Sequence, residues 1–137
     1  MGRGKTKMVR EIGERARLRA LLVIGLLAFA AVACNQVVLR TAPEPALACD
    51  AALTAGRLVS SRESSLALRP ADGGPNIAVT WPFGYSAGGF VGGLELRDEA
   101  GRLLAREGDF VQVGGGMGGD DTWVACAGSV SVIPAPG

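Results

Sequence analysis

The sequence predicts an all-β fold, a small antiparallel barrel or sandwich of about eight short strands, preceded by an N-terminal hydrophobic signal helix. Three observations carry this prediction. Apolar residues after Cys34 recur with a period of two in short runs, as in half-buried strands. Turn residues separate these runs, and 21 of the 137 residues are Gly. Downstream of Cys34, no helical period is sustained for about ten residues, the length at which we would expect a long helix.

Each expected strand is bounded by turn residues. In "NIAVTWP", for example, Ile77, Val79 and Trp81 share one face and Ala78 and Thr80 share the other. A single short helical turn is expected in "CDAALTAG", residues 49 to 56. The expected strands are, in order, 56–61, 65–70, 76–82, 93–98, 102–107, 110–115, 122–127 and 129–134.

The N-terminal 33 residues have the order of a secretory signal. They hold seven Lys or Arg against two Glu, a net charge of +5, and the basic stretch ends at Arg19. The apolar run "ALLVIGLLAFAAVA" follows, and small residues precede Cys34. Under each of the three interpretations given next, the chain after this segment is exported.

Three interpretations of Cys34 remain open on the sequence. Residues 31–34, "AVAC", resemble the bacterial lipobox, in which the Cys is acylated and becomes the first residue; the resemblance implies a lipoprotein carrying acyl chains such as palmitate on Cys34. The same residues satisfy the A-x-A rule for ordinary cleavage and secretion. A third interpretation is an uncleaved anchor, because residues 20–39 contain no charge and would span about 30 Å as a helix.

The odd number of cysteines favours the lipoprotein interpretation. An exported chain with three Cys must account for the odd one. Cys49 and Cys126 stand near the two ends of the expected domain and are predicted to form a disulfide, which leaves Cys34 for the lipid. The predicted organisation is a lipoprotein-type signal peptide over 1–33, a tether over 34–48 containing Pro43 and Pro45, and a small β-domain over 49–137.

The segment "WPFGYSAGGF…LRDEAGRLLAREGDFVQVGGG", with its flanking cysteines, also resembles the small β-domains of uncharacterised bacterial envelope lipoproteins. In those domains a Trp-Pro segment is followed by a D-x-x-G hairpin and by G-D before a Gly-rich loop. The resemblance covers residues 49–134. It implies a β-fold and structural turns, with no established activity.

Composition excludes several kinds of chemistry. The chain has no His, and no Lys after Lys7, so His-based nucleophilic catalysis, His-ligated metals and, beyond the leader, a Schiff-base Lys are excluded. Residues 34–137 carry seven Arg against eleven Asp or Glu, a net charge of −4 that argues against nucleic-acid binding. No cofactor is expected.

Three motifs that look chemical are interpreted as structural. "GYSAG" places Ser86 in a G-x-S-x-G pattern, but no His base exists and no helix follows. "GGGMGG" matches a dinucleotide fingerprint but precedes an expected strand. "GGMGGD" matches one copy of a calcium repeat that ends at Asp120, so Asp120 and the adjacent Asp121 are weak calcium candidates, although no metal is expected. The paired carboxylates of predicted turns are Asp98, Glu99, Glu107 and Asp109.

The aromatic cluster of "WPFGY", formed by Trp81, Phe83 and Tyr85, is the candidate binding site. The rings either plug the end of the barrel, which the sequence favours, or form an exposed platform for an envelope protein or glycan. The predicted function is a membrane-anchored, extracytoplasmic, non-catalytic module with a binding or adaptor role, held at the cell membrane by a lipid on Cys34. The alternatives are a signal-anchored structural envelope protein and a weak carboxylate-based hydrolase.

Overall fold

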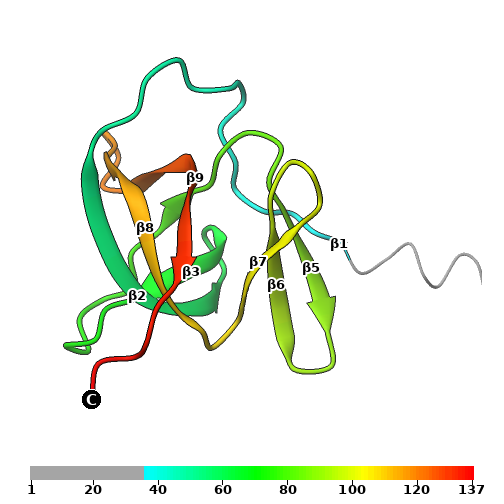
Figure 1. The fold of residues 1–137 in the computed structure, drawn as a ribbon, viewed down its shortest axis with the longest axis vertical. Coiled ribbons are helices and arrows are strands. Elements are labelled where there is room, and N and C mark those ends of the chain that lie inside the picture. The colour runs from blue at the N-terminus through cyan, green and yellow to red at the C-terminus, as the bar shows by residue number, and fades with distance from the viewer. Residues whose placement is uncertain (1–35) are drawn as a thin grey trace, which may run out of the picture. The chain divides into compact units, whose positions relative to one another are not determined.

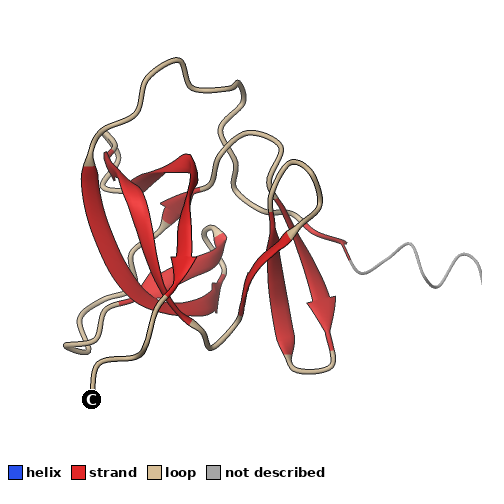
Figure 2. Cartoon of the chain, in the orientation of Figure 1, coloured by secondary structure: helices blue, strands red, loops and turns tan. Residues whose placement is uncertain are grey.

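The computed structural model describes residues 36–137, which form nine strands in two sheets (Figure 1). Within this range there is no helix, so the all-β prediction is confirmed (Figure 2). It follows that no helix of residues 36–137 is able to cross a bilayer. The predicted signal segment and Cys34 lie outside the described residues.

The larger sheet is barrel-like. Its order is β3-β2-β8-β9-β4, and its neighbours are antiparallel except for the parallel pair β4 and β9. Leu68 and Ile77 exchange two backbone hydrogen bonds, 3.0 and 2.7 Å long, which join β3 to the chain just before β4 and nearly close the sheet. Its strands are β2 (Ala52–Ser61), β3 (Ser65–Arg69), β4 (Val79–Thr80), β8 (Phe110–Met117) and β9 (Trp123–Val132).

The smaller sheet is antiparallel throughout and has the order β1-β5-β6-β7. In Figure 1 the β5–β6 hairpin runs to a turn at the lower end of this sheet. Contacts between β7 and β9 join this sheet to the larger one. The strands are β1 (Gln36–Val37), β5 (Ser86–Phe90), β6 (Gly93–Arg97) and β7 (Leu103–Arg106).

One hydrophobic core serves both sheets. Alternate residues of the strands enter it, as the period-two pattern predicts, and Trp81 is the largest of its fully buried side chains. Asp98, Ser64 and Thr122 are the buried polar residues in the described chain. The core side chains with no more than 1% exposure include Leu58, Leu66, Leu68, Val79, Trp81, Leu96, Val111 and Val113.

Three local predictions differ from the structure. Residues 86–90 form β5, which was not predicted because "SAGGF" contains two Gly and no apolar alternation. The expected strands 122–127 and 129–134 are the single strand β9, whose residues 126–129 bulge opposite β8 and include Gly128 at φ 73°. The helical turn expected in 49–56 is wrong, because Ala52 onward pairs with β8.

The domain begins earlier than predicted. Gln36 and Val37 pair with Gly88 and Ala87 of β5, and Leu39 lies in the core. The proposed tether over 34–48 therefore does not hold for residues 36–42, which belong to the folded domain, and the predicted domain start at 49 is too late. The physical reason is the apolar pair Val37 and Leu39, whose burial attaches this segment to the smaller sheet.

The Gly tract is part of a strand instead of a loop. Gly114, Gly115 and Gly116 lie in β8 and are buried. A Cβ atom on Gly115 would lie 2.1 Å from the carbonyl oxygen of Val124, and one on Gly116 would lie 2.3 Å from a carboxylate oxygen of Asp50. These glycines allow neighbouring backbone and side chains to approach closely, which explains the tract without a nucleotide.

We expect Gly115→Ala to destabilise the domain by about 3 kcal/mol, the upper end of the usual cost of overpacking, because its Cβ has no room beside Val124. Gly88→Ala is the matched control, since a Cβ on this strand glycine meets nothing within 4 Å. Urea unfolding of the two variants measures the difference. Equal free energies of unfolding would contradict the close approach.

Candidate functional site: the groove beside the disulfide

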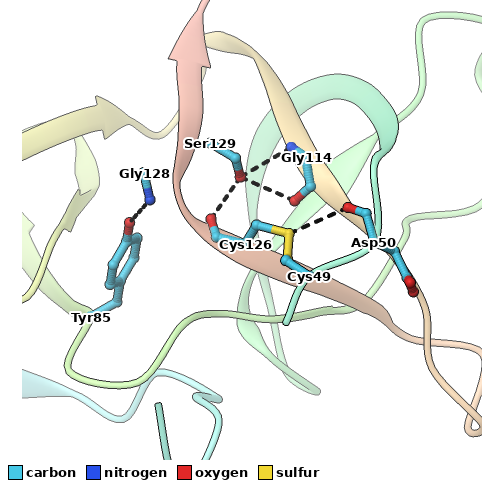
Figure 3. The surroundings of a disulfide bond; sticks show 7 residues. All are labelled: Cys49, Asp50, Tyr85, Gly114, Cys126, Gly128 and Ser129. Carbon is cyan, nitrogen blue, oxygen red and sulfur yellow. Dashed lines mark hydrogen bonds between the residues drawn. A yellow bond between two sulfur atoms is a disulfide. The ribbon is translucent and has the colours of Figure 1, made fainter. Parts of the chain in front are cut away.

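A disulfide joins the chain before β2 to the bulge of β9. Cys49 and Cys126 are bonded in the structure, with their Cα atoms 5.9 Å apart (Figure 3). The Gly114 amide donates a hydrogen bond of 3.1 Å to Ser129 Oγ, and this hydroxyl lies 2.6 Å from the Cys126 carbonyl oxygen. The bulge is therefore fixed both covalently and by hydrogen bonds next to β8.

The structure separates the three predicted aromatic binding residues. Trp81 is fully buried, and its indole N–H donates to the Leu66 carbonyl oxygen at 3.0 Å. Tyr85 is also buried, and its hydroxyl accepts a hydrogen bond of 3.0 Å from the Gly128 amide (Figure 3). Phe83 remains 42% exposed. Two of the rings plug the fold, and Phe83 is the aromatic residue of the cluster that is accessible to a partner.

Phe83 stands in a shallow groove of about 320 Å³ that runs past the disulfide. One wall is the segment from Ala42 to Cys49, and the opposite wall is β9 from Val124 to Ala127. Leu47 and Val124 add exposed apolar surface on these two walls. Glu99 supplies the one charged side chain of the lining. The groove is thus mainly apolar and offers little hydrogen bonding.

A larger cleft of about 550 Å³ lies between the β6–β7 turn and β9. Its buried carboxylate, Asp98, accepts hydrogen bonds from the Arg102 amide at 2.9 Å and from the Arg102 guanidinium at 2.7 Å. The Arg102 amide, followed by the guanidinium, holds the pKa of Asp98 below its usual value of 3.8. Asp98 therefore stays ionised and holds the turn, and it is a poor general acid.

Two further predicted carboxylates also hold turns. The Glu107 carboxylate accepts hydrogen bonds from the amides of Ser60 and Leu94, at 3.1 and 3.0 Å, and thereby bridges the two sheets. Asp109 accepts one from the Arg106 amide at 2.7 Å. Such bonds occupy the carboxylate oxygens that catalysis would need. This arrangement does not favour the carboxylate hydrolase.

The calcium candidates have other surroundings. Asp120 forms an ion pair with Arg40 and accepts a hydrogen bond from the Thr122 hydroxyl. The hydroxyl, followed by the guanidinium, lowers the pKa of Asp120 below its usual value of 3.8. Asp121 is exposed and has a φ of 58°. Among residues 36–137, no group of three Asp, Glu, Cys or His is gathered in a way that could hold a metal.

The remaining sequence motifs are also explained by the fold. Ser86 lies in β5 and not on a strand-to-helix turn, so the nucleophile elbow is not formed. Leu47 and Val124, which line the groove, were not predicted. Their exposure depends on contacts between distant segments, and an exposed apolar residue in a Pro-containing stretch such as "TAPEPALA" gives no signal of its own.

No protein-family model, curated protein or solved structure matches this chain.

Acid should weaken the domain through Asp98. A carboxyl whose pKa is lowered by folding contributes stability above its unfolded pKa, and this contribution is lost as the pH falls through the folded pKa. We expect the urea midpoint to fall between about pH 5 and about pH 3, and to fall less in Asp98→Asn, which removes the titrating group. Urea unfolding at a series of pH values tests this. The same fall in both proteins would contradict the assignment.

Proposed function

We propose that this chain is an exported, lipid-anchored, non-catalytic binding module, whose mature form begins at an acylated Cys34. The observation that carries the proposal is that the folded domain reaches close to this cysteine, because Val37 pairs with Ala87 of β5 and Leu39 lies in the core. Removal of a lipoprotein signal before Cys34 would leave this domain intact. The enzyme alternative is disfavoured because the buried and bridging carboxylates are engaged in turns.

The positions of Val37 and Leu39 also argue against an uncleaved anchor. A span over the uncharged residues 20–39 would need Val37 and Leu39, but Val37 pairs with β5 and Leu39 is in the core. Residues 20–35 would extend about 24 Å as a helix, which is less than the roughly 30 Å hydrocarbon core. The chain is therefore better suited to cleavage before Cys34 than to a transmembrane helix.

The cysteine pairing supports the lipid and the compartment. A Cys49–Cys126 disulfide is typical of an oxidising, extracytoplasmic environment. With these two sulfurs bonded to each other, Cys34 is the cysteine left for acylation. Since a single acyl chain anchors only marginally, stable attachment requires two or more chains on this residue.

We infer that the groove beside the disulfide, lined by Phe83, Leu47 and Val124, binds an apolar polypeptide segment of an envelope protein. Glycan sites combine aromatic stacking with several polar groups, whereas this groove has one charged side chain, Glu99. β4 ends at Thr80, opposite Val124, so its pairing along β9 stops where the groove begins. The chemistry of the lining therefore favours an apolar peptide over a sugar.

Intact mass of the membrane-fraction protein tests the anchor. We expect a chain that begins at Cys34 and carries added acyl mass, whereas Cys34→Ala should lack that mass because the acceptor thiol is absent. The domain of this variant should keep its Cys49–Cys126 bond, and the mass with and without reduction checks this. An unmodified full-length mass in both proteins would contradict the proposal.

Site-specific photo-crosslinking tests the groove. A benzoylphenylalanine at position 83 should give a discrete, protease-sensitive adduct in cells, because this position faces the proposed peptide. The matched control is position 132, where Val132 is exposed near the end of β9. An adduct that resists protease but contains polysaccharide would indicate that the groove binds a glycan instead of a peptide. If position 83 gives no adduct, or if both positions give the same adduct, the groove is excluded as the binding site.

A further inference from the structure

The β5–β6 hairpin and the N-terminal entry of the domain lie at the same end of the smaller sheet. Gln36 is opposite Gly88 and Val37 is opposite Ala87, in an antiparallel pair. Going back along the chain from Gln36 is therefore the same direction as going forward from Gly88 to the hairpin turn. In the sequence, Cys34 precedes Gln36 by two residues, a chain length of at most about 7 Å.

The hairpin tip, defined as residues 90–93, is uncharged and exposes an apolar side chain. Its sequence is "FVGG", and the whole stretch from Ser86 to Leu94 carries no charged residue. Val91 is 107% exposed, which means that no neighbour in the described chain covers it. A fully exposed Val between a strand end and two Gly has no role in the packing of the domain.

The opposite end of the same sheet is charged. The β6–β7 turn contains Asp98, Glu99 and Arg102, and the Arg102 side chain is 80% exposed. Along β5 and β6 the residues from Ser86 to Leu94, at the end near the chain entry, carry no charge, whereas the turn at the far end of β6 is ionic. This is the distribution expected when one end faces lipid and the other faces water.

We propose that the hairpin tip is a second, non-covalent membrane contact, in which Val91 enters the interface of the leaflet that holds the lipid on Cys34. This inference rests on the proposed anchor and gives it an orientation. The polar part of one leaflet is several Å thick, about the length of two strand residues. An acylated Cys34 thus brings the tip to the depth of the lipid headgroups.

Charged groups next to the hairpin tip limit how deeply the tip enters the membrane. The Glu107 carboxylate lies close to Gly93 and accepts a hydrogen bond from the Leu94 amide at 3.0 Å. On the strand that follows the tip, Glu95 pairs with Arg97 and Arg106. Since charges are costly to place in the hydrocarbon core, only the turn itself enters, and Glu95 remains at the water side.

The test uses the mature lipidated protein with Val91→Trp, and Ala100→Trp as the matched control. Ala100 is exposed in the turn at the far end of the same sheet. The proteins are reconstituted in phosphatidylcholine vesicles with and without brominated acyl chains, a neutral lipid that avoids repulsion from the acidic domain. Wild type supplies the background from the buried Trp81 and Trp123.

We expect the emission of Val91→Trp to shift to the blue on vesicles and to be quenched by the brominated chains, with neither change in Ala100→Trp. Quenching at neither position, or equally at both, would overturn the tip contact. The intact mass of the same preparations distinguishes a failure of the tip contact from a failure of the lipid anchor. An acylated protein without quenching refutes the tip contact alone, whereas a mass without acyl chains refutes the anchor and this inference together.

Discussion

The burial of Trp81 is the constraint on which the rest of the structure depends. Its backbone amide donates to the Arg40 carbonyl oxygen at 2.9 Å, and its own carbonyl oxygen accepts from the Ala42 amide at 2.8 Å. Its indole N–H is bonded to the carbonyl oxygen of Leu66 in β3. A ring of this size buries roughly 150–250 Å² and dominates a small core. One residue thus holds the segment around Arg40 and Ala42 against the barrel.

The same contact shapes the groove. Residues 43–48 lie between two fixed points, the Ala42–Trp81 hydrogen bond and the disulfide at Cys49. A short segment held at both ends has few conformations to lose when it binds a partner. Closing the 77-residue separation between the cysteines stabilises by at most about 4.5 kcal/mol on the chain-entropy model. The disulfide therefore contributes to stability and also positions the wall that faces Phe83.

Local pattern was sufficient for the fold class but not for the site. The apolar pattern in 65–69 and 110–113 predicts strands, and β3 and β8 form there, although burial extends beyond the alternation to Ala67 and Phe110. β5 escaped prediction because Gly88 and Gly89 carry no pattern, and its pairing depends on β1 and β6. In the sequence, nothing distinguishes the expected exposure of Phe83 from that of the neighbouring aromatic residues. Its exposure, like the position of Leu47, is decided by contacts between segments far apart in the chain.

Hydrogen–deuterium exchange of the amides of Ala42 and Trp81 tests the central claim most directly, because both are hydrogen-bonded only if the N-terminal segment is part of the domain. The account predicts that these two amides are protected to nearly the level of the β2–β8 ladder, whereas the exposed residues 46–48 exchange rapidly. Exchange of Ala42 as fast as that of residues 46–48 would contradict it. The domain would then begin at Cys49, and both the short link to Cys34 and the oriented hairpin tip would be lost.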